Sequence, residues 1–204
     1  MIKVFILSGS GISAESGVRT YRGDVGLWEE HRIDDVATPE GFAADPGLVH
    51  RFYNMRRGDA ARAQPNAAHR ALARLGRHHD LTLITQNVDD LHERAGARVL
   101  AHLHGSLFEH RCAECGAPAD VDPGAPADSE AAGSEADLEA MLREAPPACP
   151  ACGTGRIRPG VVWFGEMLPA RALAETTAAI EALTEGDVVL VVDVDEHDEV
   201  VLGG

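Results

Sequence analysis

The sequence predicts an α/β fold in which a parallel sheet carries helices on both faces and a small metal-binding module is inserted into the chain. Three observations predict it. Short apolar runs typical of buried strands alternate with amphipathic segments typical of helices. A glycine turn follows the first apolar run, and two Cys-x-x-Cys pairs lie further along the chain. We expect residues 1–110 and 159–204 to form the sheet domain and residues 111–158 to form the metal module.

Composition and charge narrow the possible functions. The 204 residues suffice for one domain with a sizeable core. With 18 basic and 33 acidic residues the formal net charge is −15, which argues against binding to nucleic acid or to an anionic membrane. No apolar run reaches the roughly 18 residues that a membrane span needs, and no signal-peptide pattern precedes the first strand. We therefore expect a cytoplasmic protein.

The individual elements follow from the apolar pattern. The first strand, residues 4–7, leads into Gly9 and Gly11, which allow a tight turn and a close approach to a ligand. A helix behind such a turn can bind an anion, although ordinary tight turns also use this pair. We expect further strands at 81–85, 99–103 and 187–192, the last of them another buried parallel strand, and helices at 45–57, 65–76 and 169–183, with one more starting at Thr38 and Pro39.

Polar side chains stand at the carboxyl ends of two expected strands. Gln86, Asn87 and Asp89 follow the strand at 81–85, and His104 follows the strand at 99–103. Ligands bind at this end of a parallel sheet, although Asn and Asp also suit a capping loop. A histidine with a pKa near neutrality can act as a general base. His102 shares a face with His104 by strand alternation, so spacing alone does not separate the two.

The four cysteines form two knuckles, Cys112-x-x-Cys115 and Cys149-x-x-Cys152, each followed by a glycine. In a cytosolic protein this spacing favours tetrahedral zinc over disulfides, with iron or a redox dithiol as the alternatives. Four thiolates leave no open position for a substrate, so we expect one structural zinc ion. The stretch between the knuckles, 117–148, is typical of a flexible loop with one short helix starting at Ser134.

Two further segments have both an ordinary and a functional interpretation. Tyr53 and Arg56 are three residues apart on the helix at 45–57 and share a face, where a solvated pair beside a core stripe is the ordinary interpretation. The apolar stretch at 158–166 is in the same way consistent with a plain buried strand. The other motifs decide between these interpretations.

Taken together, the motifs resemble the sirtuins, the NAD-dependent protein lysine deacylases. The resemblance lies in Gly-Ser-Gly-Ile-Ser-Ala-Glu-Ser-Gly, Tyr-Arg-Gly, Gly-Leu-Trp, Ile-Thr-Gln-Asn-Val-Asp-Asp-Leu-His and Arg-Pro-Gly-Val-Val-Trp-Phe-Gly-Glu. It implies a Rossmann-like sheet that binds NAD, with His104 as the general base and Asn87 as a second catalytic residue. The cofactor contacts that it implies come from Gly9, Ser10, Gly11, Ile12, Ser13, Tyr21, Arg22, Trp28, Gln86, Asn87 and Asp89.

A narrower resemblance concerns the acyl group. Phe-Tyr-x-x-Arg-Arg followed by Gln-Pro-Asn-Ala-Ala-His is similar to the sirtuins that remove acidic acyl groups. It implies that Tyr53 and Arg56 hold the carboxylate of succinyl- or malonyl-lysine. The activity implied is removal of succinyl or malonyl groups, in preference to acetyl, from protein lysines, giving nicotinamide and O-acyl-ADP-ribose. Contacts to the substrate peptide and its acyl-lysine are implied for Val162, Phe164, Gly165 and Glu166.

The resemblance covers about residues 2–192. After Val192 sirtuins continue with Gly-Thr-Ser and further strands, whereas this chain continues with Asp193 and more carboxylates, so we expect the last part of the family domain to be missing. Carboxylates supply acceptors where a pyrophosphate needs donors, and they repel the anion. Two alternatives follow: an impaired protein that binds acyl-lysine peptides but holds NAD poorly, and an ADP-ribosyltransferase.

Overall fold

The computed structural model describes residues 2–19, 27–28, 31–120 and 145–193, which fall into two compact units. The first, here called the sheet unit, comprises Met1–Tyr21, Ala63–His104 and Leu168–Gly204. The second, here called the cysteine unit, comprises Arg22–Arg62 and Gly105–Met167. The short helix expected from Ser134 lies outside the described residues. No helix in the described ranges has both the length and the apolar character needed to cross a bilayer.

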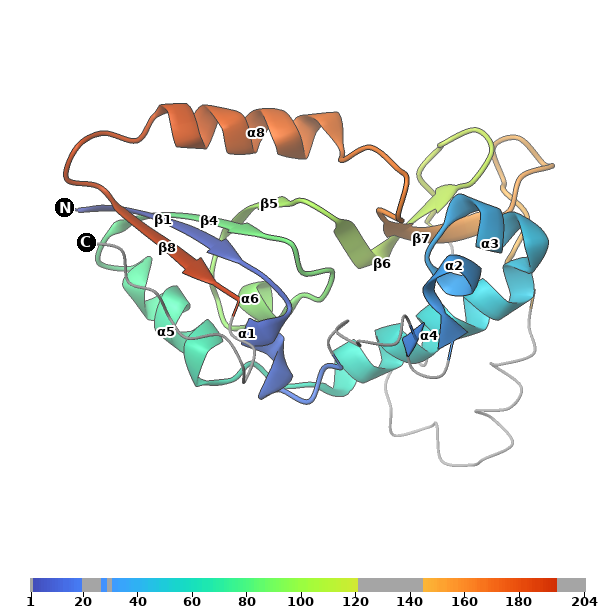
Figure 1. The fold of residues 1–204 in the computed structure, drawn as a ribbon, viewed down its shortest axis with the longest axis horizontal. Coiled ribbons are helices and arrows are strands. Elements are labelled where there is room, and N and C mark those ends of the chain that lie inside the picture. The colour runs from blue at the N-terminus through green and yellow to red at the C-terminus, as the bar shows by residue number, and fades with distance from the viewer. Residues whose placement is uncertain (1, 20–26, 29–30, 121–144, 194–204) are drawn as a thin grey trace. The chain divides into compact units, whose positions relative to one another are not determined.

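The sheet unit is built on a four-stranded parallel sheet in the order β5-β4-β1-β8 (Figure 1). Its strands are β1 (Lys3–Ser8), β4 (Asp80–Thr85), β5 (Val99–His102) and β8 (Val188–Val192). β1 is central: Ser8, its last residue, lies opposite Thr85 of β4 and Val192 of β8. The strands therefore end at one common edge of the sheet, where the chain carries its polar motifs.

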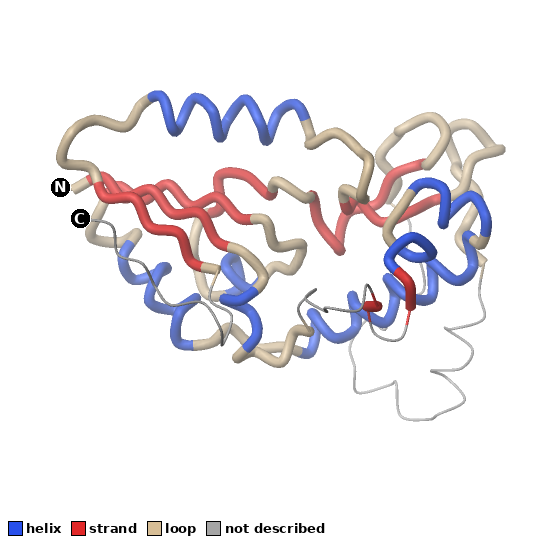
Figure 2. Tube along the Cα trace, viewed as in Figure 1, coloured by secondary structure: helices blue, strands red, loops and turns tan. Residues whose placement is uncertain are grey.

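Helices cover both faces of this sheet (Figure 2). One side carries α1 (Gly11–Ala14), α5 (Ala67–Leu75) and α6 (Leu91–Arg94), and the other carries α8 (Ala170–Glu181). Side chains alternate along β1: Ile6 packs in the core cluster with Leu72 of α5, whereas Phe5 packs in the cluster with Ala172 of α8. The expected α/β fold with a Rossmann-like parallel sheet is confirmed.

β8 is parallel, as expected, but the expectation that it is buried is wrong. Leu190 and Val192 pack into the core cluster beside α5. Val189 and Val191 point to the opposite face because side chains alternate along a strand, and they are 53% and 69% exposed. Within the described residues β8 is an edge strand, and α8 packs against β5 at the other edge. Among the described residues, the face of β8 that carries Val189 and Val191 is therefore exposed.

The cysteine unit combines the long helix α4 and shorter helices with two antiparallel ladders, one of β2 (Leu27–Trp28) with β3 (His31–Arg32) and one of β6 (Gly105–Cys112) with β7 (Ile157–Val161). Thr38 accepts a hydrogen bond from Gly41 N at 3.0 Å with Pro39 in the first turn, which confirms that helix start. The helix expected at 45–57 is longer, and β6 has no counterpart among the expected strands. The elements are β2 (Leu27–Trp28), β3 (His31–Arg32), α2 (Ile33–Val36), α3 (Pro39–Ala44), α4 (Pro46–Arg62), β6 (Gly105–Cys112) and β7 (Ile157–Val161).

Two buried histidines, His69 and His92, lie close to the carboxyl end of β1 in the sheet unit. The Ser8 hydroxyl donates to Thr85 Oγ1 at 2.9 Å, and His92 Nε2 lies 2.9 Å from Ser8 Oγ. Because Ser8 has used its only proton, His92 Nε2–H is the donor, which leaves Nδ1 unprotonated. Burial lowers the pKa of His92 to about 4. Burial also lowers the pKa of His69, whose ring centroid lies 4.9 Å from that of His92.

Acidification should therefore destabilise the sheet unit through His92. An unfolded histidine titrates near its ordinary pKa of 6.5, so between about pH 6.5 and pH 4 the unfolded state binds a proton that the folded state does not. The stability from this group is complete above about pH 6.5 and falls by on the order of 3 kcal/mol as the pH approaches 4. In urea unfolding at about pH 7 and pH 5, His92→Gln should lose less stability on acidification than the wild type.

The matched control for this measurement is His78→Gln, because His78 is exposed. Its loss of stability between the two pH values should equal that of the wild type. A His92→Gln variant with the wild-type pH dependence would show that His92 does not bind the proton responsible.

Candidate functional site

The glycine turn after β1 receives a carboxylate from its own chain. Gly11 N donates to Asp193 Oδ1 at 3.1 Å, and Gly9 N donates to the Val192 carbonyl at 2.9 Å. A Cβ atom on Gly9 would overlap the Asp193 carboxylate, so this close approach requires glycine. The turn thus offers a backbone N–H to an anionic oxygen, which is the chemistry expected for a cofactor phosphate.

A buried chain of hydrogen bonds connects α1 to the end of β4. Asn87 Nδ2 donates to Ser13 Oγ at 3.0 Å, and Ser13 Oγ donates to Asp89 Oδ2 at 3.0 Å. The Asn87 N–H donates to Thr85 Oγ1, and the second Asp89 oxygen accepts from Leu91 N. Asn87 Oδ1 is buried and has no hydrogen-bond partner among the described residues. An acceptor left open in this way fits a hydroxyl donor such as a ribose of NAD.

His102 and His104 have different environments. His102 Nδ1 lies 2.8 Å from the Asn87 carbonyl, and its Nε2 lies 2.8 Å from Glu93 Oε1. Burial lowers the pKa of His102, but the bonds to these two acceptors outweigh burial and raise it above its ordinary value. Burial lowers the pKa of His104, against a hydrogen bond to the Gln86 backbone. Burial thus favours the neutral form of His104, which is the form that accepts a proton.

The remaining expected cofactor residues stay predictions. Ile12 is buried in the core cluster beside α5, and Gln86 is exposed. The backbone of Trp28 forms the end of β2. Tyr21 and Arg22 lie outside the described residues. Ser10 is the N-cap residue of α1.

Tyr53 and Arg56 are both buried on α4, with exposed fractions of 1% and 7%, so the interpretation as a solvated pair is wrong. The Tyr53 hydroxyl accepts a hydrogen bond from Trp163 Nε1 at 2.9 Å. Burial raises the pKa of Tyr53 to about 12, so the phenol keeps its proton at neutral pH. The Arg56 guanidinium carbon lies 5.9 Å from the ring centroid of Phe52. Together the pair can present an O–H and several N–H donors to one anionic group.

The segment after β7 carries the other expected substrate residues, which stay predictions. Val162 is half-buried, and the Phe164 side chain is 53% exposed. The Phe164 N–H donates to the Ala37 carbonyl at 3.0 Å, and Gly165 adopts a φ of +84° that favours glycine. The backbone here is therefore fixed while Phe164 faces outward.

Glu166 is held by groups of its own unit. Its carboxylate accepts from Arg158 at 2.6 and 2.9 Å, from Arg111 at 3.1 and 3.2 Å, and from the Trp163 N–H at 2.8 Å. Burial raises the pKa of Glu166, but these bonds outweigh burial and lower it. Arg158 had no predicted role of its own. The sequence signal that could have identified this pairing is an arginine at the start of the apolar stretch 158–166, which ends in a glutamate.

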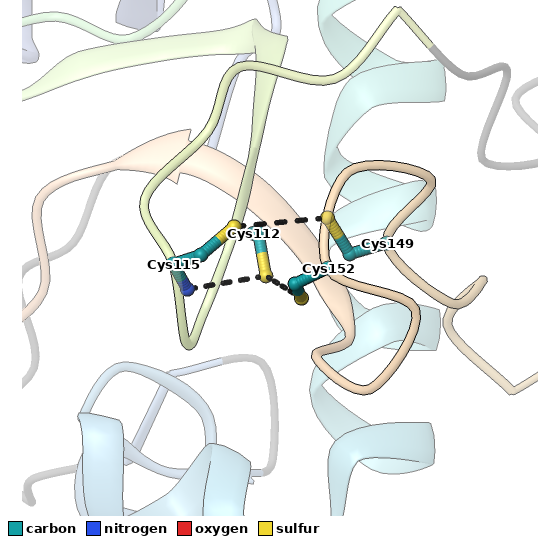
Figure 3. A group of neighbouring side chains, drawn as sticks. All are labelled: Cys112, Cys115, Cys149 and Cys152. Carbon is teal, nitrogen blue, oxygen red and sulfur yellow. Dashed lines mark hydrogen bonds between the residues drawn. The ribbon is translucent and has the colours of Figure 1, made fainter.

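The four cysteine side chains converge between the end of β6 and the loop before β7 (Figure 3). All four Sγ atoms lie within 4.8 Å of one another. Cys112 Sγ is 3.8 Å from Cys152 Sγ, and Cys115 Sγ is 3.8 Å from Cys149 Sγ, so the thiols are not disulfide-bonded. Sulfurs at about 2.3 Å from one tetrahedral zinc ion stand about 3.8 Å apart. The cluster therefore fits one structural zinc ion.

Backbone N–H groups favour thiolates in this cluster. Gly155 N donates to Cys152 Sγ at 3.3 Å, and this bond, with those from Thr154, lowers the pKa of Cys152 to about 6. The Ala117 amide lowers the pKa of Cys115, but the neighbouring thiols outweigh it and raise that pKa to about 11. Four adjacent thiolates repel one another, so a divalent cation is what allows all of them to ionise together.

The model of the Sir2 family matches residues 9–195, a range that contains the glycine turn, Asn87, His104 and all four cysteines. NAD-dependent protein deacylase 1 of Pseudomonas aeruginosa is 50% identical over 179 residues, covering 87% of this chain and 68% of that protein. The NAD-dependent protein deacylase of Methylococcus capsulatus is 47% identical over 180 residues, covering 87% and 67%. The chain thus spans about two thirds of the length of these curated relatives.

Solved structures are similar along nearly the whole chain. A Sir2 homologue in complex with NAD is 44% identical, with a TM-score of 0.74, and the match covers 93% of this chain and 66% of that one. A structure of Sir2Tm bound to a propionylated peptide is 29% identical, with a TM-score of 0.68, and covers 93% and 69%.

Removing one thiolate should release the metal. Cys149→Ser leaves three thiolates, so zinc content after purification, measured with a chromogenic chelator, should fall from one ion per chain to a small fraction of that. The melting temperature should fall by on the order of 10 °C because metal binding contributes to folding. Ala151→Ser, in the same knuckle, keeps all four ligands and is the matched control. Full zinc occupancy in Cys149→Ser would show that the four thiols do not form the site.

Proposed function

Because the chain belongs to the Sir2 family, we propose that it removes acidic acyl groups, succinyl or malonyl, from protein lysines. NAD-dependent protein deacylation is the activity that comes with family membership. The acidic acyl preference is the further step, and the products are nicotinamide and O-acyl-ADP-ribose. The observation that carries it is the buried pair of a protonated phenol and a guanidinium on one face of α4, Tyr53 and Arg56.

The sheet unit supplies the groups proposed for the cofactor. NAD, when bound, supplies a ribosyl carbon whose bond to nicotinamide can be exchanged for a bond to the acyl oxygen. Gly11 N offers a donor to a phosphate oxygen, and the open Asn87 Oδ1 accepts from a ribose hydroxyl. Neutral His104 takes a proton from a ribose hydroxyl. Ser13 and Asp89 fix the orientation of the Asn87 amide, because Nδ2 donates to Ser13 Oγ and Ser13 Oγ donates to Asp89.

The cysteine unit supplies the groups proposed for the acyl chain. A carboxylate at the end of a succinyl or malonyl group needs donors, and an arginine can give two in parallel. Burial strengthens such a charged hydrogen bond because no water competes for it. An acetyl group has no carboxylate to accept hydrogen bonds from Tyr53 and Arg56, so the pair favours the acidic acyl groups.

Arg56→Met should lower the preference for acidic acyl groups. Methionine keeps a flexible chain but removes the charge, so kcat/KM for a succinyl-lysine peptide should fall by about 10- to 100-fold more than kcat/KM for the matching acetyl peptide. Arg62→Met, at the exposed end of α4, is the matched control and should leave the ratio of the two values at the wild-type level. Equal losses for both peptides in Arg56→Met would remove the acidic acyl assignment.

A second candidate function has one observation in its favour. The Asp193 carboxylate already accepts from Gly11 N and lies against Gly9, where a cofactor phosphate would bring the same charge. Two anions at one donor repel each other. On this alternative the chain binds acylated peptides but holds NAD poorly, and the acidic residue is the cause.

Calorimetric titration with NAD separates the two candidates. If Asp193 blocks the cofactor, the wild type should give no heat at roughly millimolar NAD, and Asp193→Asn should bind at least about tenfold more tightly because the charge is removed and the size is kept. Asp80→Asn, at the exposed start of β4, is the matched control for net charge. Wild-type binding at micromolar NAD that Asp193→Asn leaves unchanged would contradict the second candidate and support the deacylase.

A further inference from the structure

Three side chains of the cysteine unit form what we call the tryptophan clamp: Trp163, Arg158 and Glu166. Trp163 is buried, and the Arg158 guanidinium carbon lies 3.2 Å from the centroid of its ring. A guanidinium stacked on an indole is attracted to the face of the ring, more so when both groups are out of water. Glu166 accepts from both terminal nitrogens of Arg158 and so fixes the guanidinium plane over the ring.

The clamp also fixes the backbone beside the indole. The Trp163 N–H donates to the Glu166 carboxylate at 2.8 Å, and the Glu166 N–H donates to the Trp163 carbonyl at 3.0 Å. Arg158 Nη2 donates to the Val161 carbonyl at 2.7 Å. The Phe42 ring packs on the indole with 5.4 Å between centroids. The indole is therefore oriented by its own backbone, by an ion pair and by an aromatic neighbour.

That orientation determines where the Tyr53 hydroxyl points. Trp163 Nε1 lies 2.9 Å from the Tyr53 oxygen. An indole N–H can only donate, so the Tyr53 oxygen accepts this bond and its own proton is directed elsewhere. Within the described ranges, the protein provides no acceptor for that proton. A buried donor without an internal acceptor points to an acceptor on a ligand.

We propose that Trp163 is a positioning residue for acyl selection, which aims the Tyr53 O–H at the carboxylate of a dicarboxylic acyl chain such as succinyl or malonyl. Arg158 and Glu166 hold the indole in the orientation that this requires. The inference rests on the proposed function, in which Tyr53 and Arg56 bind that carboxylate. The new element is that selectivity for the acidic acyl groups also depends on Trp163, which acts by orienting Tyr53 and does not contact the acyl group itself.

Trp163→Phe tests this because phenylalanine keeps an aromatic face for Arg158 and removes the N–H donor. KM for a succinyl-lysine peptide should rise about tenfold more than KM for the acetyl peptide, as expected for one buried hydrogen bond, with a smaller effect on kcat. Calorimetry with the succinyl peptide alone gives a readout that does not depend on turnover, and Kd should weaken by about the same factor. Equal effects on both peptides would indicate a general structural role and overturn the inference.

A double-mutant cycle with Tyr53→Phe shows whether the two residues act as one unit. Once Tyr53 lacks its hydroxyl, Trp163→Phe should cause almost no further fall in the succinyl-to-acetyl ratio. If Trp163→Phe lowers the succinyl-to-acetyl ratio by the same factor with and without the Tyr53 hydroxyl, the two residues act independently and the inference is overturned. If Trp163→Phe proves too unstable to assay, site-specific incorporation of the tryptophan analogue with sulfur in place of the N–H keeps the ring size, and the same cycle applies.

The outcomes for the proposed function and for this inference are distinguishable. A wild-type chain with no preference for succinyl over acetyl contradicts the proposed function, whatever Trp163→Phe does. A wild-type preference that Tyr53→Phe abolishes and Trp163→Phe leaves intact contradicts only the role assigned to Trp163.

Discussion

The hydrogen bond between the Ser8 and Thr85 hydroxyls joins the carboxyl ends of β1 and β4 inside the core. Thr85 Oγ1 also accepts a hydrogen bond from the Asn87 backbone N–H, and the Asn87 side chain in turn donates to Ser13 Oγ on α1. The loops that leave the two strands are therefore tied together at their first residues. In a parallel sheet the loops are otherwise free to separate once they leave the ladder, so this buried contact sets the geometry on which the proposed cofactor site depends.

The two units hold their functional segments by different means. Below the glycine turn Ser8 bonds two neutral side chains, Thr85 and His92, and burial lowers the pKa of His92 and so favours its uncharged ring. In the cysteine unit the central contact is ionic, with Arg158 and Glu166 out of most of the solvent. A buried ion pair contributes little net stability because both charges lose hydration, but removal of either partner is strongly unfavourable. Its effect is to select one conformation for the segment around Trp163, which suits a segment that must present side chains in a fixed direction.

Much of the sheet unit was predictable from the sequence because its signals are local. The apolar run at β1 and the periodic pattern of α5 each depend on residues close together in the chain. In the cysteine unit the same holds for the two knuckles, each defined by its own local spacing. The position of β8 in the sheet was not predictable in this way. A run of five aliphatic residues predicts a strand, but its place in the order and the exposure of its Val189 and Val191 face among the described residues depend on what packs beside it. Strand order depends on contacts between residues far apart in sequence.

Prediction of the candidate site has the same limit, because some of its contacts join residues whose contact is not visible in the sequence. Asn87 and His104 are predicted site residues because motif and strand end coincide, and they stay predictions; the structure shows an open Asn87 Oδ1 and burial that lowers the pKa of His104. Arg158 was missed because its partners, the Trp163 face and Glu166, come together only when the turn after β7 closes. The contact of Asp193 with Gly11 was missed for a related reason: the sequence showed an acceptor where donors were expected, but not that the acceptor would reach the turn.

The uncovered face of β8 has a consequence for how copies of this chain behave towards one another. Among the residues that the structure describes, Val188–Val192 is an aliphatic strand at the edge of the sheet, and such strands can pair with strands of other molecules. Asp187 and Asp193 flank it directly, and charged flanking residues oppose such pairing because they would be brought together in a stacked assembly. A formal charge of −15 adds long-range repulsion between chains. The carboxylates at both ends of the strand therefore oppose its pairing with a strand of another molecule, and added salt weakens this opposition because it screens the charges.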